Sequence, residues 1–74
     1  MDSISKRAVQ AIRERAEQNG TSVSFECDMI NVSRKTFYFW ENNKNNPQAY
    51  FLQQMALAGY DVIYILTGVR SNVK

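Results

Sequence analysis

The 74-residue chain has no histidine and a single cysteine, Cys27. It therefore cannot form a disulfide within the chain or a zinc site of cysteine and histidine, and it has no imidazole for acid–base catalysis. No apolar run approaches the roughly 20 residues that cross a bilayer, and the first ten residues contain no apolar signal segment. We expect a cytoplasmic protein without a cofactor, a metal or a membrane partner.

The remaining composition is that of one small globular domain, with 45% hydrophobic and 22% charged residues. Nine Lys and Arg against seven Asp and Glu leave a net charge of +2. A charge this small does not by itself indicate nucleic-acid binding, so only clustered cations would count. We expect the domain to span residues 1–68 and residues 69–74 to form a flexible tail.

Apolar residues recur at helical spacing, and short polar stretches separate them. The pattern predicts an all-α fold, a compact bundle of five helices over residues 4–19, 23–30, 34–42, 47–58 and 62–67. Ser3 or Asp2, Ser22 or Thr21, Ser33 and Asp61 stand where helices begin, and their oxygens can accept from free first-turn amides. Pro47 is expected at the first position of the fourth helix, where its missing N–H costs nothing. The inner stripe of that helix is expected to be Ala49, Leu52, Met55 and Ala56.

Only residues 31–33 join the second and third predicted helices, which indicates a helix-turn-helix. In that motif the second helix presents its N-terminal outer face to the DNA major groove, while its inner face packs on the first helix. Helical spacing places Phe37 and Trp40 inward. Four residues then face outward as candidates to read bases: Arg34, Lys35, Tyr38 and Phe39. The cations suit guanine acceptors and the aromatic rings suit thymine methyl groups, although a short helix can also bury Phe39.

The chain resembles the phage-repressor (lambda-repressor-like, XRE-type) helix-turn-helix family over its whole length, loosely at first and strongly from Asn31 onward. The motif of that family reads x-V-S-R, then W-E-x-G-K-x-x-P, and closes with D-x-x-Y-x-L-T-G. The positions that fit it in register are Val32, Ser33, Arg34, Thr36, Trp40, Glu41, Lys44, Pro47, Asp61, Tyr64, Leu66, Thr67 and Gly68. The resemblance implies a bacterial or phage-encoded transcriptional regulator, a repressor that binds operator DNA as a two-fold homodimer.

The same resemblance implies which residues hold the DNA backbone. These phosphate-binding candidates are Ser33, Asn42, Asn43 and Lys44, with Ser33 also capping the third helix. Asn43 stands where the family prefers glycine, and asparagine is the next-best residue for a left-handed backbone. We expect Glu41 to make internal hydrogen bonds.

The second helix departs from the family pattern. Val23 replaces a common glutamine that would donate to phosphate, and Phe25-Glu26 inverts the usual polar-then-apolar order. Either this helix is rotated or slipped, or Phe25 is partly exposed. Cys27 fills the slot of a small core residue, and Glu26 and Asp28 would place negative charge near the DNA side.

Dimerisation requires a surface patch. Ile63 occupies an outward position on the last helix, and Tyr60 and Tyr64 or Ile65 lie beside it. These residues either form a small two-fold patch or close the core of a tiny domain.

The sequence also bears on two other classes of function. An enzyme is not expected, because the paired carboxylates fit solvated helix faces and the chain is too short to build a pocket. The alternative is a helix-turn-helix module, including an antitoxin-type regulator, that docks on another protein through Tyr38, Phe39 and Phe25. Arg34 and Lys35 argue against it, since they lie where a major-groove helix needs cations.

Overall fold

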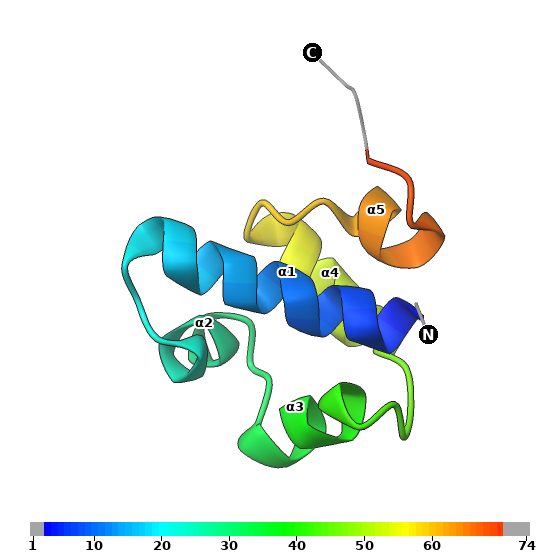
Figure 1. The fold of residues 1–74 in the computed structure, drawn as a ribbon, viewed down its shortest axis with the longest axis horizontal. Coiled ribbons are helices and arrows are strands. Elements are labelled where there is room, and N and C mark those ends of the chain that lie inside the picture. The colour runs from blue at the N-terminus through cyan, green and yellow to red at the C-terminus, as the bar shows by residue number, and fades with distance from the viewer. Residues whose placement is uncertain (1–2, 71–74) are drawn as a thin grey trace.

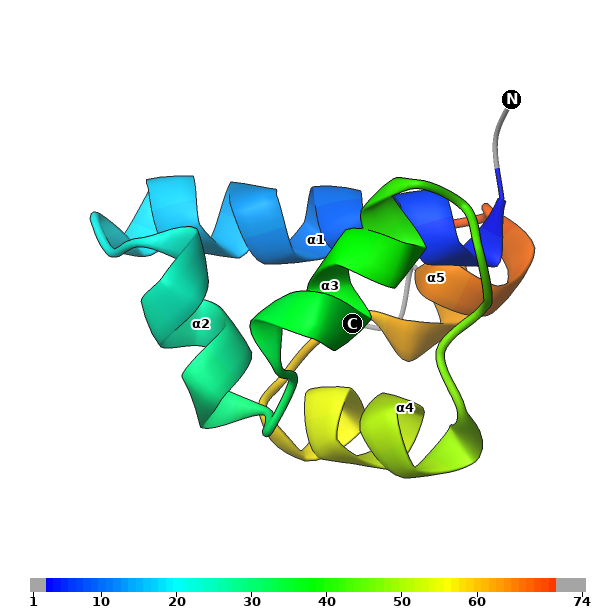
Figure 2. The same ribbon diagram turned by 90° about the horizontal axis from the view of Figure 1, so that it is seen from below.

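The computed structural model describes residues 3–70, which form five helices and no strand. They are α1 (Ile4–Asn19), α2 (Val23–Met29), α3 (Arg34–Glu41), α4 (Ala49–Leu57) and α5 (Val62–Thr67). In Figure 1, α1 runs across the molecule, with α2 and α3 below it, α4 behind it and α5 above one end. Figure 2, seen from below, shows α3 in front of α1 and α4. The all-helical class and the five helices predicted from the sequence are confirmed.

Four helices begin at the predicted side-chain caps. Ser3, Ser22, Ser33 and Asp61 each accept a hydrogen bond from the backbone N–H three residues ahead, over 3.0–3.2 Å. Gly20 and Gly68 follow α1 and α5 with φ of 67° and 81°. This left-handed backbone ends each helix.

The prediction for α4 is wrong in two respects. The helix begins at Ala49 after an extended Gln48, and Pro47 lies two residues before it with its ring buried. The inner face holds Met55 and the half-buried Leu52, while Ala49 and Ala56 are exposed. Phe51 turns inward instead, because its ring meets Trp40 edge to face with centroids 5.6 Å apart. A large aromatic ring gains more from burial than an alanine methyl does, so it sets the rotation of the helix.

The core lies where the helices converge on α1. Four helices and the turn after α2 each contribute one large, fully buried side chain to it. These side chains are Ile12, Ile30, Trp40, Met55 and Ile65. Trp40 is 1% exposed, and Phe37 is half-buried beside it on α3. Both therefore face inward from α3, as the spacing predicts.

Cations of α1 cap the C-terminal ends of three other helices. Lys6 Nζ donates to the last carbonyl of α3 at 2.7 Å. Arg7 Nε and Nη2 donate to carbonyls in the last turn of α5 at 2.9 and 3.2 Å. Arg15 Nη1 donates to the carbonyl just after α4 at 2.7 Å. Positive charge at a helix C-terminus satisfies free carbonyls and opposes the negative end of the helix dipole.

Replacing Arg7 should therefore destabilise the fold more strongly than the replacement of a charged residue usually does. Arg7→Ala removes a buried guanidinium that holds two carbonyls of α5, and we expect a loss of about 3 kcal/mol in the free energy of unfolding. Urea denaturation followed by circular dichroism measures it. Arg13→Ala is the matched control, because the ion pair of Arg13 with Glu41 is exposed and should contribute less than about 1 kcal/mol. Equal losses in the two variants would contradict the capping role.

Candidate functional site

Residues 30–33 hold α2 and α3 in a fixed relation. Asn31 adopts a φ of 60°, and the N–H of the buried Val32 donates to the Cys27 carbonyl at 2.9 Å. Across the turn, Arg34 Nη2 donates to Ser24 Oγ at 3.2 Å. The left-handed backbone at Asn31 thus turns the chain, and the first residue of α3 is tied to the first turn of α2.

The unusual order of residues in α2 is present in the structure. Phe25 is 51% exposed, whereas Glu26 is buried and its carboxylate accepts from the Thr21 hydroxyl. Of the two alternatives for this helix, an exposed Phe25 is the one observed. Because Glu26 is buried, only Asp28 of the two acidic residues remains exposed, and the prediction of surface charge at Glu26 is wrong.

Three of the four base-reading candidates are exposed on α3. These are Arg34, Lys35 and Tyr38, and Tyr38 keeps 54% of its surface accessible. Phe39 is half-buried, with its ring centroid 6.2 Å from that of Tyr38 and Lys35 Nζ 5.8 Å from its centre. The outer surface of α3 is therefore an aromatic pair next to two cations.

Of the four phosphate-binding candidates, Ser33 precedes α3 and the other three follow it. The side chains of all but Lys44 form hydrogen bonds within the chain. Ser33 caps α3 and contacts the Thr36 hydroxyl at 3.0 Å. The Asn42 amide group turns back to the Tyr38 carbonyl at 2.9 Å. Asn43 has the left-handed φ of 57° that its position predicts. Its amide oxygen lies at the start of α1.

Lys44 is exposed, and its side chain forms no hydrogen bond or ion pair with any residue from 3 to 70. Its backbone is nevertheless fixed, because the Lys44 N–H donates to the Phe39 carbonyl at 2.8 Å. An ammonium on an anchored backbone can bind an anion without first breaking an internal contact.

The predicted dimer patch is only partly on the surface. Ile63 is exposed and Tyr64 is half-buried, whereas Tyr60 and Ile65 follow the other alternative and close the core. The Tyr60 ring is buried, with the Arg15 guanidinium 4.0 Å from its centre. Other exposed apolar side chains near the end of the described chain are Leu57, Leu66 and Val69.

Cys27 and Tyr60 are buried groups whose ionisation the fold opposes. Burial raises the pKa of the Cys27 thiol from 9.0 to about 11, and it raises the pKa of Tyr60 from 10.0 to about 12. The thiol is thus a small core group, as predicted, and is held in the unreactive neutral form. The Tyr60 hydroxyl has no hydrogen-bond partner within the described part of the chain.

These shifts predict that the protein loses stability in alkali. The neutral forms are favoured in the folded state, so their contribution is full below pH 9 and disappears between pH 9 and about 12. Tyr60→Phe removes a buried hydroxyl without a partner and should change stability by less than about 1 kcal/mol at pH 7. Above pH 10 this variant should melt at a higher temperature than the parent. Identical melting curves across pH 7–12 would contradict the assignment.

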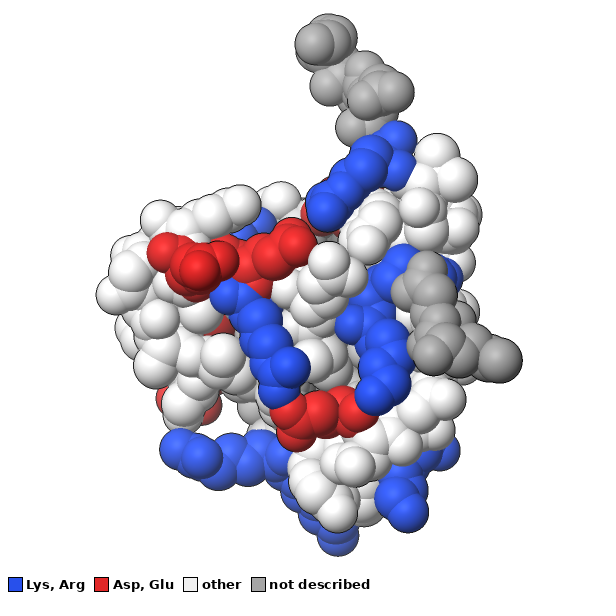
Figure 3. Space-filling model, in the orientation of Figure 1, with Lys and Arg blue, Asp and Glu red and all other residues white. Residues whose placement is uncertain are grey.

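Acidic and basic side chains are unevenly distributed. Figure 3 shows blue side chains along the lower edge of the molecule, where Figure 1 draws α3. The cations of α3 and of the loop after it are Arg34, Lys35 and Lys44. By contrast, Arg13 pairs with Glu41, and Arg70 pairs with Glu14 at 3.7 Å.

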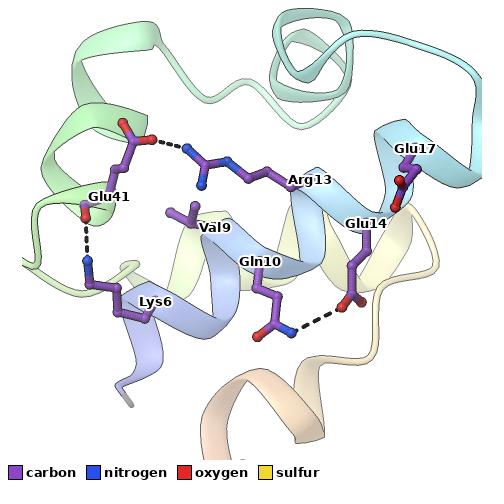
Figure 4. A pocket seen from close by; sticks show the side chains of 7 residues that line it. All are labelled: Lys6, Val9, Gln10, Arg13, Glu14, Glu17 and Glu41. Atoms are coloured by element: carbon purple, nitrogen blue, oxygen red, sulfur yellow. Dashed lines mark hydrogen bonds and ion pairs between the residues drawn. The ribbon is translucent and has the colours of Figure 1, made fainter. Parts of the chain in front are cut away.

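A shallow hollow of about 440 Å³ lies on α1 beside the end of α3 (Figure 4). Its lining residues are Lys6, Val9, Gln10, Arg13, Glu14, Glu17 and Glu41. In Figure 4, Lys6 and Arg13 both point from α1 toward Glu41. These internal contacts confirm the role predicted for Glu41 and make the hollow a tie between α1 and α3.

The chain matches no protein-family model, no curated protein and no solved structure. No group of three or more His, Cys, Asp or Glu side chains among residues 3–70 could hold a metal ion. Over the same residues, no helix is both long and apolar enough to cross a membrane.

Proposed function

We propose that this protein is a sequence-specific DNA-binding transcriptional regulator, a cytoplasmic repressor of phage or prophage type. α2, residues 30–33 and α3 act as a helix-turn-helix, and α3 enters the major groove of operator DNA. The observation that carries this proposal is the division of the cations. Those of α1 bond within the fold, while Arg34, Lys35 and Lys44 are exposed without a carboxylate partner among residues 3–70.

A net charge of +2 is compatible with DNA binding when the available cations are gathered in one place. The α1 cations are bonded to helix carbonyls or to a carboxylate, so their donors are directed into the fold and not toward an external anion. The exposed ones lie on one short helix and the loop after it, which gives a small protein a local positive surface. Such a surface attracts the phosphate backbone and supplies the salt-dependent part of binding.

The orientation of α3 also supports the proposal. Trp40 anchors the inner face, so the first turn and the outer face are accessible. Arg34 and Lys35 can donate to guanine O6 and N7, and Tyr38 offers apolar contact for a thymine methyl group. Phe39 is half-buried, so its proposed contact is limited to its accessible edge.

We further propose a homodimer on an inverted repeat, because a single short helix reads few base pairs. Two-fold symmetry would place the two α3 helices roughly 34 Å apart, one turn of DNA. Ile63, with Leu66 and Val69 nearby in sequence, offers the exposed apolar surface for the contact. In this arrangement Tyr64 forms the edge of the patch.

The second candidate function is docking on another protein, such as a toxin. It is favoured by Phe25 and Met29, which project from successive turns of α2 and are 51% and 63% exposed. Exposed apolar residues of this kind often mark protein contacts. The cations of α3 have no evident role in such a contact.

Fluorescence anisotropy with duplex DNA tests the proposal directly. Lys44→Ala should weaken binding to all sequences alike and flatten the slope of log affinity against log salt by about one unit, because one phosphate contact is lost. Gln53→Ala, an exposed neutral residue on α4, is the control and should bind as the parent does. Unchanged affinity and slope in Lys44→Ala would contradict the role of Lys44.

A further inference from the structure

The beginning of α1 and the loop after α3 are joined by hydrogen bonds between residues far apart in sequence. Asn43 Oδ1 accepts from the Ser5 hydroxyl at 2.8 Å and from the Ser3 hydroxyl at 3.0 Å. Ser5 is completely buried, and Ser3 is itself fixed because its oxygen caps α1. The oxygen end of this amide is therefore held against the body of the protein.

A carboxamide has an acceptor at one end and two donors at the other. With Asn43 Oδ1 directed at the two serines, Nδ2 is directed away from them. Asn43 is an exposed residue, and Nδ2 forms no hydrogen bond with any residue from 3 to 70. It is next to Lys44, whose ammonium is also unpaired over that range.

We propose that Ser3 and Ser5 orient the Asn43 amide as a fixed donor for an anionic oxygen, and that Asn43 and Lys44 together form a phosphate-binding pair. This inference rests on the proposed function, in which the anion is a phosphate of the DNA backbone. The serines are positioning residues, since they act through Asn43. Asn42 differs in this respect, because its amide donors face the Tyr38 carbonyl within α3.

Asparagine meets two requirements at this position that glycine meets only in part. The backbone φ of 57° is left-handed, which glycine adopts freely and asparagine tolerates. Only asparagine also accepts from both serines and presents donors outward. A left-handed backbone costs free energy at a residue with a side chain, and at Asn43 the hydrogen bonds from the two serines offset that cost.

Asn43→Asp is the sharpest test, because aspartate has the same shape and tolerates the same backbone. Its carboxylate can still accept from both serines, so the melting temperature should not fall. The outward donor becomes an anion facing phosphate, and affinity for duplex DNA should fall about tenfold or more. Asn45→Asp makes the same charge change at an exposed residue of the same loop and should weaken binding less than about threefold.

Two further measurements separate a directed donor from general charge effects. Ser5→Ala should weaken DNA binding about threefold without changing the salt slope, since no charge is lost. The side-chain amide signals of Asn43 in a ¹⁵N–¹H spectrum should shift on titration with inorganic phosphate, and those of Asn42 should not. If Asn43→Asp lowers stability, Asn43→Gly retains the backbone and should still bind DNA more weakly than the parent.

The outcomes distinguish this inference from the proposed function. Equal effects of Asn43→Asp and Asn45→Asp, or an Asn43→Asp variant that binds as the parent does, would overturn the directed donor. If Lys44→Ala still weakened binding in that case, DNA binding itself would stand. A parent protein that binds no DNA would overturn both.

Discussion

Trp40→Ala should unfold the protein at room temperature or leave it barely folded. Trp40 is the largest fully buried side chain, and it joins α3 to the core through its edge-to-face contact with Phe51. Truncating a buried tryptophan costs about 3–5 kcal/mol through lost apolar contacts and the cavity that remains. A domain of this size has a total stability of roughly 5 kcal/mol, so little would be left.

Thermal melting by circular dichroism measures this loss. Tyr38→Ala is the matched control, because Tyr38 lies on the same helix but is more than half exposed, and its melting temperature should stay within a few degrees of the parent's. A Trp40→Ala protein that melts at the parent temperature would contradict the packing of α3 described above. It would also remove the reason for α3 to present a fixed outer face.

Arg34→Ala should lower operator affinity by about 1–3 kcal/mol and relax the preference at one base pair. Arg34 is the first residue of α3, and the first turn of a helix in the major groove meets the base edges. Two N–H groups of its guanidinium match the two acceptors of guanine, O6 and N7. In the free protein it is held by a hydrogen bond to Ser24. That contact is weak enough to be exchanged for a base.

The measurement is a competition assay over all single-base variants of a selected operator. Arg34→Lys keeps the charge but not the two-pronged geometry, so it should retain affinity for non-specific DNA and still lose discrimination at that base pair. If Arg34→Ala kept both affinity and preference, α3 would not read DNA through its first turn. The salt slope should change by about one unit only if Arg34 contacts phosphate instead.

Most of the fold was predictable because local chemistry determines it. Ser3, Ser22, Ser33 and Asp61 cap the helices at which they stand, and Asn43 takes the left-handed backbone expected of it. The start and rotation of α4 were not predictable in this way. They depend on where Pro47 and the Phe51 ring pack, and that is decided by Trp40 and the rest of the core.

The candidate site was predictable where it follows helical spacing and not where it depends on long-range contacts. Arg34, Lys35 and Tyr38 are exposed as their spacing on α3 requires. The serines that hold Asn43 are 38 and 40 positions away in sequence, and no local pattern links them. The burial of Glu26 is likewise a consequence of packing between helices, which its residue type alone opposed.

Selection of binding sites from a random pool of duplex DNA, at physiological salt and with this chain alone, tests the central claim most directly. The account predicts enrichment of an inverted repeat whose half-sites are centred about one helical turn apart. Arg34→Ala should then select a site relaxed at one position of each half. The absence of any enriched sequence, with only weak salt-sensitive binding, would contradict DNA recognition by α3 and favour docking on a protein through Phe25, Met29 and Tyr38.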